Sequence, residues 1–571
     1  MRVSEEVRAA GPTARWRIAP PPHLLPDVAA PRIVRALLAV RRISDPAAWL
    51  WDDAPPAGPL DLPGIDRAAD RLRHARHRGE TVAIYGDYDV DGVTATAQLV
   101  EGLRAFGLRT LPYIPNRYTE GYGLNADAIR TLHDAGAHLL LTVDCGVSAH
   151  AEVALARRLG MDVMVLDHHI EPSTPGGRVP ATAIINPRDA PPGHPSAHLA
   201  SAGLAFRLLQ HLAQELDEPL DEPGLLQLAA LGTLADVVPL LGDNRRIVRA
   251  GLRALAATAR PGLRALCAVA RVVPSQYDAA LDEEAVLFQL APRLNAAGRL
   301  THARTALDLL LADQPGRAAA LADELDVLNR QRQRETEQAL AEAIAQVEGT
   351  PGEAVLVAGS AAMRAGIVGL VAARLTELYG RPAFAYAVEG ERARGSARGV
   401  PGFDVTRALA DASHLLERFG GHAQAAGFTV AVARLDAFRS ALAEAASRQL
   451  PDGAGRAPLE VDLAFRLRYL GREVAGWLAR LGPFGPGNPP PTFLSRDITV
   501  SAARRVGAGA EHLALELEDA GARWRAIAFR AARRPWLPTA GERIDVVYRP
   551  RPERNGYQPD LLLLDFAPSA S

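Results

Sequence analysis

The chain has 571 residues, of which 48% are hydrophobic and 23% are charged, and its formal net charge is −2. This length predicts several domains, and the near-neutral charge confines any nucleic-acid site to a local region or to bound metal ions. All 64 basic residues are arginine, which excludes a Walker A loop and a Schiff-base enzyme. The two cysteines, Cys145 and Cys267, exclude a disulfide framework and a CxxC zinc site. Because no long apolar run and no secretory signal is recognised, we expect no membrane contact and a cytoplasmic location.

Residues 1–75 are rich in proline and are interpreted as an N-terminal extension with one helix near residues 31–40. An α/β pattern follows in a predicted domain over residues 76–245. Its predicted strands are 81–85, 138–144, 162–167 and 181–187, and its predicted helices include 92–107 and 149–160. Alternation of apolar strands with helices predicts a parallel sheet covered on both faces.

The sequence pattern in the second half of the chain predicts three further structural regions. Residues 246–349 are interpreted as a helical connector that ends in a long charged helix over 317–348, and residues 224–259 before it are also helical in character. A second, smaller α/β domain is predicted over 350–450, beginning with a strand at 354–359. After a linker at 449–458, short alternating runs over 459–571 predict a small β-rich domain.

Acidic residues follow the first predicted strand in the stretch GDYDVDG, where Asp87, Asp89 and Asp91 alternate with other residues. A calcium-binding loop also begins DxDxDG, but its twelfth position requires a glutamate and here holds Gln98. A helix should also precede such a loop, whereas a strand is predicted. The remaining alternatives are a solvated acidic turn and a functional site.

Two further strands favour the functional site. Asp144 ends the second predicted strand, and Asp167, His168 and His169 end the third. The carboxyl ends of parallel strands meet at one edge of the sheet, where open α/β folds bind ligands. So many carboxylates cannot all ionise together without a cation, and they exceed what one ion needs. We therefore expect two divalent cations, Mn²⁺ or Mg²⁺ rather than zinc, arranged for displacement at phosphorus.

The motifs VLDHH, GDYDVDG and VDCG together resemble the DHH phosphoesterase superfamily, and within it the RecJ exonucleases. The segments NRYTEGYGLN (116–125), LGTLADVVPL (231–240), LNAAGRL (294–300), GSARG (395–399), GGHAQAAG (420–427) and FGPGNPPPTF (484–493) extend the resemblance over about residues 75–565. It implies a DHH domain, a DHHA1-type second domain and a C-terminal OB-like domain. It departs from the family pattern at Gly399 and at residues 363–365.

The resemblance also implies roles for residues. The implied metal ligands are Asp87, Asp89, Asp91, Asp144, His168 and Asp236, with Asp144 as the bridge and with Asp87 alternatively supporting the ligands from behind. The implied catalytic residues are His169, in contact with the scissile phosphate, and Asp167, which orients the imidazole beside it. The implied phosphate or nucleotide contacts are Arg117, Arg299, Ser396, Arg398 and His422. Without the resemblance, Asp236 and any single arginine would be interpreted as solvated surface charges.

The implied function is 5′→3′ hydrolysis of single-stranded DNA to 5′-mononucleotides in recombination and repair. Arginines interleaved with Trp524, Phe529, Tyr548 and Tyr557 are compatible with base stacking in an OB fold, although a role in its core is the simpler interpretation for most of these aromatics. The alternatives are a DHH-type oligoribonuclease or nucleotide phosphatase, and a non-catalytic DNA-binding scaffold. We expect a monomer, with a single-strand-binding protein or a helicase as candidate partners.

Overall fold

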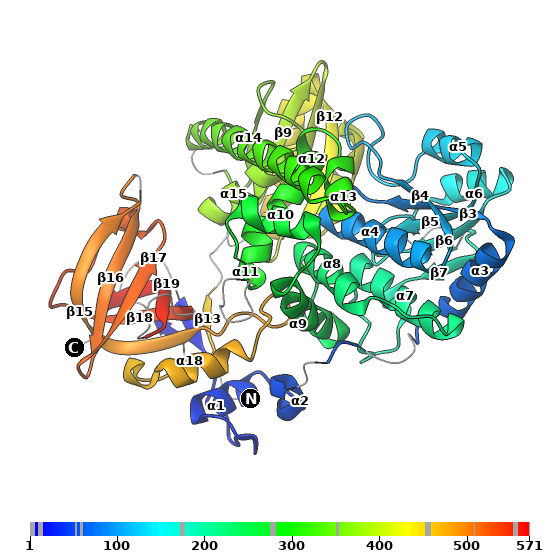
Figure 1. Ribbon diagram of the computed structural model, residues 1–571. Helices are drawn as coiled ribbons and strands as arrows, with labels where there is room; N and C mark the ends of the chain where they lie inside the picture. Colours follow the sequence, from blue (N-terminus) through cyan, green and yellow to red (C-terminus); the bar gives the residue numbers. More distant parts are fainter. Residues whose placement is uncertain are drawn as a thin grey trace.

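The computed structural model describes residues 6–8, 15–51, 54–56, 61–171, 177–273, 281–349, 353–450, 458–507, 509–551 and 558–569. Two α/β units and a β-barrel are arranged around a group of helices (Figure 1). The predicted fold class is confirmed, and among the described residues no helix combines the length and apolarity needed to cross a membrane.

The first α/β unit is built on a five-stranded, fully parallel sheet of strand order β4-β3-β5-β6-β7. Its strands are β3 (Thr81–Gly86), β4 (Arg109–Tyr113), β5 (Ala137–Val143), β6 (Asp162–Leu166) and β7 (Ala183–Ile185). The edge strand β4 was not predicted, because it is short, contains Pro112 and is only partly buried. The three strands predicted to carry the acidic residues, β3, β5 and β6, lie side by side.

Alternating strand side chains point to opposite faces of this sheet and meet different helices. Val82 and Leu141 pack with α3, α4 and α7, whereas Ala83 and Leu140 pack with α5 and α6. The helices of this unit are α3 (Ile65–Arg78), α4 (Val90–Ala105), α5 (Ala126–Asp134), α6 (His150–Arg158), α7 (Ser201–Leu216), α8 (Glu222–Ala235) and α9 (Gly242–Ala256). The helical stretch predicted at 224–259 is thus two helices, α8 and α9, separated by the loop 236–241.

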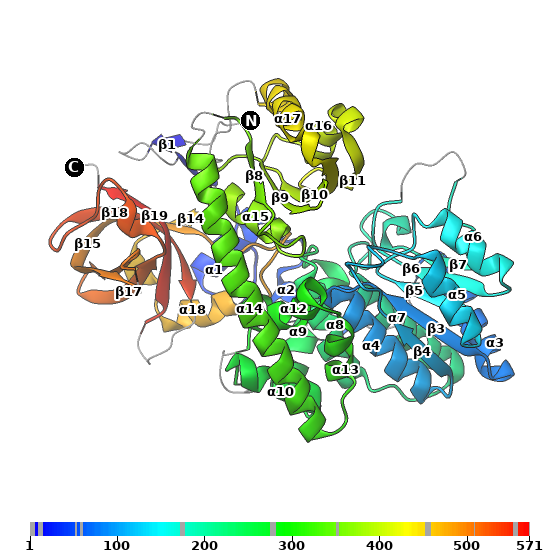
Figure 2. The same ribbon diagram turned by 90° about the horizontal axis from the view of Figure 1, so that it is seen from above.

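The connecting region ends in α14, a helix of 34 residues whose two halves pack in different cores. Ala318 and Leu325 pack against α10 and α12, while Ala343 and Val347 pack against the second α/β unit. Figure 2 shows α14 crossing the middle of the molecule, with the barrel on one side and the parallel sheet on the other. The helical segments here are α10 (Pro261–Ala270), α11 (Glu283–Ala285), the π-helical turn Val286–Leu290, α12 (Ala291–Leu300), α13 (Arg304–Leu310) and α14 (Pro315–Glu348).

The second α/β unit has the strand order β11-β12-β10-β9-β8, in which only β8 and β9 run parallel. Its elements are β8 (Leu356–Ser360), α15 (Val368–Tyr379), β9 (Ala383–Glu389), β10 (Arg392–Arg398), α16 (Val405–Asp411), β11 (Leu416–His422), β12 (Ala425–Ala431) and α17 (Leu435–Gln449). A core centred on Phe384, Phe428 and Phe438 joins α16 and α17 to the sheet.

The C-terminal strands close into a barrel because β15 pairs with both β16 and β18. Its elements are β14 (Leu463–Ala464), α18 (Arg472–Ala479), β15 (Phe493–Val506), β16 (His512–Asp519), β17 (Ala522–Ala528), β18 (Arg543–Arg551) and β19 (Asp560–Pro568). Trp524 and Tyr548 are core residues, whereas Phe529 is 50% exposed and Tyr557 lies outside the described residues. Among the described residues of this set, Phe529 is therefore the exposed aromatic side chain.

The N-terminal segment packs against the barrel rather than against the parallel sheet. Strand β2 pairs with β13, and α1 contributes Leu37 and Leu38 to the barrel core. The elements are β1 (Glu6–Arg8), β2 (Arg15–Ile18), α1 (Arg32–Val40), α2 (Pro46–Trp51) and β13 (Leu459–Val461). Short 3-10 turns lie at Pro187–Asp189, Ser413–Leu415, Val432–Arg434, Leu467–Tyr469 and Ala531–Arg533.

Candidate metal centre

The turn from β3 into α4 brings three carboxylates close to the sheet edge. Asp89 is the N-cap of α4 and accepts a hydrogen bond from the Gly92 amide at 3.1 Å. A side chain on Gly92 would lie 2.6 Å from the backbone of Asp87, so glycine is required for this close turn. Asp87 and Asp91 are both almost fully buried.

The carboxylate of Asp91 is held by the start of α7. Its two oxygens accept hydrogen bonds at 2.8 Å from the backbone amides of Ser201 and Ala202. These amides have no partner within their own helix, and a helix N-terminus favours negative charge. The Ser201 hydroxyl also donates to Asp144 at 3.0 Å. One helix end therefore orients two of the predicted ligands.

Asp144 follows β5 in a left-handed backbone conformation, with φ of 65°. Such a conformation is uncommon outside glycine and costs free energy, so the surrounding contacts must hold it. The Asp144 amide donates to Leu166 O at 3.0 Å, which ties it to the end of β6. This conformation places a carboxylate, 2% exposed, at the centre of the site.

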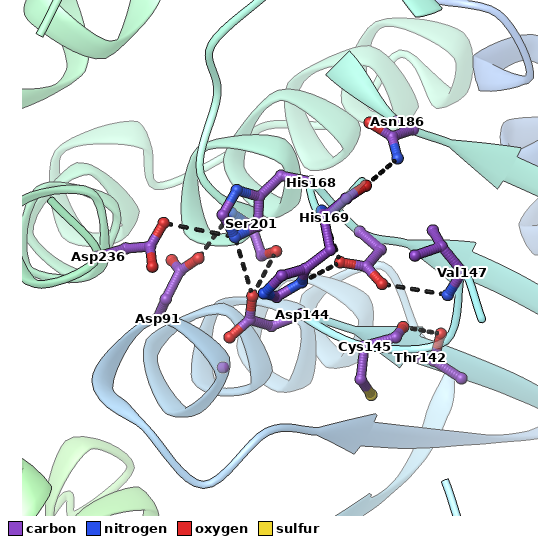
Figure 3. Close-up of polar contacts among 12 residues, drawn as sticks. Asp91, Thr142, Asp144, Cys145, Val147, His168, His169, Asn186, Ser201 and Asp236 are labelled. Carbon is purple, nitrogen blue, oxygen red and sulfur yellow. Dashed lines mark hydrogen bonds and ion pairs between the residues drawn. The ribbon is translucent and has the colours of Figure 1, made fainter. Parts of the chain in front are cut away.

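His168 and His169 follow β6 and point to different partners (Figure 3). His168 Nε2 lies 3.4 Å from Asp144 Oδ1 and 3.4 Å from Asp236 Oδ2. His169 Nδ1 lies 2.7 Å from Asp167 Oδ1. Asp167 also accepts from the backbone amides of His169 and Val147, both at 3.1 Å.

Asp236 reaches the site from the end of α8, far in sequence from the three strand ends. It is the residue that ends α8, and α8 packs against α4. Its carboxylate faces His168 Nε2, the same ring nitrogen that faces Asp144 (Figure 3). The structure thus brings all six predicted ligands together, each at the end of a strand or helix.

The donor atoms form overlapping groups in which every pair of atoms is within 4.8 Å. These groups are Asp144–His168–His169, Asp91–His168–Asp236 and Asp87–Asp89–Asp144. Asp144 and His168 each belong to two groups. Among the described residues, one atom each of Asp87, His168 and Asp236 is buried without a hydrogen-bond partner. Buried donors and acceptors normally have partners, so this donor set fits two divalent cations that share a ligand.

The pKa values of the clustered side chains reflect both their burial and the repulsion among the carboxylates. Burial and neighbouring Asp89 raise the pKa of Asp91 to about 7, and burial and neighbouring Asp91 raise that of Asp236 to about 9. Burial and the nearby carboxylates also raise the pKa of Asp144 well above its ordinary value. Burial and the adjacent His169 lower the pKa of His168 to about 4, so this imidazole is neutral and can act as a ligand. Cations would stabilise the ionised carboxylates that burial disfavours.

Basic side chains from the connector and the second α/β unit face this centre. Burial and the charge of Arg117 lower the pKa of Arg299 to about 10, and the same two causes lower that of Arg398. Arg398 donates to Ser396 Oγ at 2.9 Å. The His422 ring lies nearly parallel to that of His169, with centroids 6.4 Å apart. Arg117, Arg299 and Arg398 therefore lie close enough for their charges to repel, and an anion among them would relieve this repulsion.

Several contacts of the site were not predicted from the sequence, although Tyr122 lies in the segment 116–125 that contributes to the family resemblance. Ser201 begins a helix, Tyr122 donates through its hydroxyl to Asp144 O at 3.4 Å, and Arg188 donates to His168 O at 2.8 Å. Each belongs to a residue type that is common at helix starts, in loops or on surfaces. Only their position in space reveals the contact.

Matches to protein-family models define the class of protein. Residues 81–233 match the DHH family, N-terminal domain, and residues 352–448 match the DHHA1 domain. Together with the carboxylate and imidazole cluster at the sheet edge, these matches define a DHH-type protein. Residues 461–560 match the RecJ OB domain.

Comparison with curated relatives identifies the family within this class of protein. The chain is 37% identical to the single-stranded-DNA-specific exonuclease RecJ of Thermus thermophilus over 512 residues, covering 88% of this chain and 72% of the relative. It is 36% identical to the Escherichia coli protein of the same name, covering 76% of this chain and 78% of the relative. The chain belongs to the RecJ family. It spans only 61% of the length of the Bacillus subtilis relative, to which it is 36% identical.

Solved structures of RecJ proteins resemble the whole architecture. The structure of Thermus thermophilus RecJ in complex with Mn²⁺ has a TM-score of 0.80 at 31% identity, covering 97% of this chain and 80% of that chain. The Mg²⁺ complex of the same protein has a TM-score of 0.73 at 30% identity, covering 97% of this chain and 79% of that chain. A further RecJ structure bound to manganese has a TM-score of 0.60 at 37% identity, covering 69% of this chain and 97% of that chain.

Proposed function

We propose that this chain is a metal-dependent exonuclease that hydrolyses phosphodiester bonds of single-stranded DNA. It would act in the 5′→3′ direction, release 5′-mononucleotides and serve DNA recombination and repair. The observation that carries the proposal is the pair of donor groups that share Asp144, in a chain of the RecJ family. Relatives named for single-stranded-DNA-specific exonuclease activity supply the substrate class.

The proposed cofactors are two divalent cations, Mn²⁺ or alternatively Mg²⁺. Such a pair supplies a hydroxide at neutral pH and stabilises negative charge on the attacking and leaving oxygens. Asp144 would be the shared ligand, because its carboxylate belongs both to the donor group with Asp87 and Asp89 and to the group with His168, and a carboxylate has two oxygens to offer. The proposed ligands are Asp87, Asp89, Asp91, Asp144, His168 and Asp236.

His169 is proposed to donate a hydrogen bond to the scissile phosphate. Burial alone would lower its pKa, but the hydrogen bond and charge of Asp167 outweigh burial and raise it. Because Nδ1 faces Asp167, the Nε2–H remains to contact a phosphate oxygen. Asp167 acts as the residue that sets the orientation and charge of this imidazole.

The arginine side of the site is proposed to hold the DNA backbone. Arg117, Arg299 and Arg398 come from the loop after β4, from α12 and from β10, so a phosphate between them would contact three parts of the fold. Guanidinium groups bind phosphates through paired hydrogen bonds. Ser396 and His422 would complete this contact surface.

The central experiment is Asp144→Ala, assayed with Mn²⁺ on a 5′-labelled single-stranded oligonucleotide. Loss of the shared carboxylate should abolish cleavage, while binding of the oligonucleotide stays close to that of the wild type because the arginines remain. Asp134→Ala, which removes an exposed carboxylate of α5, is the matched control and should cleave normally. Cleavage by Asp144→Ala at the wild-type rate would refute the assignment of this residue as the shared ligand.

Substrate preference separates the proposal from its alternatives. Long single-stranded DNA should be digested much faster than dinucleotides, which an oligoribonuclease or nucleotide phosphatase would prefer. Blunt duplex should be digested more slowly than the free strand, since we infer that the site between the α/β units admits one strand. Zero cleavage at pH 7–8 with Mn²⁺ would instead support a non-catalytic DNA-binding scaffold. A monomeric state, a cytoplasmic location and a single-strand-binding protein or helicase as partner stay predictions.

A further inference from the structure

The segment FGPGN (484–488) lies outside the barrel strands and against the loop that carries Asp236. The Leu240 amide donates to Pro486 O at 2.8 Å. A side chain on Gly485 would lie 2.8 Å from Leu240 Cδ1. At Gly487, where φ is 76°, a side chain would lie 3.0 Å from Leu241 Cγ. A side chain on either glycine would therefore press on the loop 236–241, and the left-handed backbone of Gly487 itself favours glycine.

The buried side chain of Asn488 holds this segment in one conformation. Its Nδ2 donates to Leu481 O at 2.8 Å and to Pro483 O at 2.9 Å, and its Oδ1 accepts from Arg41 at 2.9 Å. The guanidinium of Arg245, in α9, donates to Leu481 O at 2.9 Å. A buried amide with several partners specifies one local structure. The loop 481–488 is thus anchored both to the N-terminal segment and to α9.

The loop 236–241 depends on such outside support. Val237 has φ of 60° and is 60% exposed, although a β-branched residue rarely adopts this conformation. Strain of this kind persists only when the surrounding structure enforces it. Leu240 is buried, and its backbone amide is bonded to Pro486 of the loop 481–488. The backbone that follows Asp236 is therefore held by the C-terminal region at Leu240, in addition to the bond from Asn244 Nδ2 to Pro239 O at 3.0 Å.

We propose that the loop 481–488 positions the metal ligand Asp236 by holding Leu240, which makes Asn488 and Gly485 positioning residues of the metal centre. This inference rests on the proposed function, in which Asp236 is a ligand. It assigns to the segment before the barrel a role in metal affinity, in addition to its connection to a DNA-binding domain. Loosening the loop should weaken metal binding without altering any ligand.

The test is Asn488→Ala in the full-length protein, with Mn²⁺ binding measured by titration calorimetry and by the Mn²⁺ concentration for half-maximal cleavage. Loss of a residue that orients a ligand commonly lowers metal affinity on the order of tenfold, and we expect a loss of this size. Ser495→Ala is the matched control, because Ser495 is a buried polar residue of the barrel that bonds to Phe465 O and not to the loop. This control should leave Mn²⁺ affinity unchanged.

A double-mutant cycle with Asp236→Asn tests whether Asn488→Ala weakens Mn²⁺ binding through Asp236. When Asp236 can no longer act as a charged ligand, Asn488→Ala should cause no further loss of affinity. Gly485→Ala, which presses on Leu240, is the second variant and should also weaken Mn²⁺ binding. Wild-type affinity in both loop variants would overturn this inference alone. Failure of the wild-type protein to bind Mn²⁺ would overturn the proposed function and this inference with it.

Discussion

Asp167 determines the charge of the imidazole that faces the proposed phosphate site. Its carboxylate accepts from His169 Nδ1 and from two backbone amides, so an asparagine in its place would turn an NH₂ group toward a donor. Asp167→Asn should therefore slow cleavage by about 10- to 100-fold, the usual cost of losing such an orienting partner. The pKa of His169, which Asp167 raises, should fall as well.

The pH–rate profile checks this prediction. A histidine that donates while protonated loses its effect as the pH rises through its pKa. Because the asparagine variant has the lower His169 pKa, its alkaline limb should move to lower pH. An unchanged profile with normal single-strand affinity would show that the charge of His169 does not contribute to the rate.

The proposed metal ligands differ in how far the sequence alone predicts their position. Asp87, Asp144 and His168 follow apolar strands, so the carboxyl ends of a parallel sheet predict that they meet. Asp236 is the C-cap of α8, which reaches the site through its packing against α4, α7 and α9. Periodicity cannot predict such a contact, and only the resemblance to a family indicated this residue.

At the scale of elements, α14 sets the relation between the two α/β units. The two ends of this helix pack in different cores, and Glu337 lies on its exposed surface between them. Glu337→Pro should cost about 3 kcal/mol by removing a backbone hydrogen bond and kinking the helix. Cleavage should fall by more than about tenfold, because small misplacements of substrate contacts cost large factors in rate.

The variant Glu337→Ala separates the effect of breaking the helix from the effect of losing the carboxylate. Alanine removes the same carboxylate but keeps the backbone hydrogen bond, so stability and cleavage should both remain near wild type. Thermal unfolding and single-turnover cleavage measure the two effects. Equal activity of the proline and alanine variants would show that the continuity of α14 is not needed to align the site.

At the scale of the whole molecule, the acidic cluster makes the stability of the metal-free protein depend on pH. Asp91 and Asp236 have pKa values of about 7 and about 9, above those of an unfolded chain. The folded state therefore binds more protons, and stability present at low pH is lost as pH rises through these values. Between its pKa in the unfolded chain and its pKa in the folded protein, each group lowers the free energy of unfolding by up to about 1.4 kcal/mol per pH unit.

Thermal unfolding in chelator and in Mn²⁺ tests this expectation. The melting temperature in chelator should fall between pH 5 and pH 9, and the stabilisation by Mn²⁺ should grow over the same range because cations replace protons. Asp236→Asn should flatten the upper part of the curve in chelator. A melting temperature in chelator that rises over this range would contradict the pKa values of the cluster.

The sequence by itself determined the local features of this protein. Strand and helix periods specified the parallel sheet, the long helix and the β-rich C-terminal region, and the acids after β3, β5 and β6 specified a cation site. Asp236 was indicated only by resemblance to a family, and only the tertiary structure shows how the ends of α7 and α8 bring Ser201 and Asp236 to that site. The physical reason is that a repeating pattern reports burial within one element, whereas a contact between distant elements depends on how their surfaces pack.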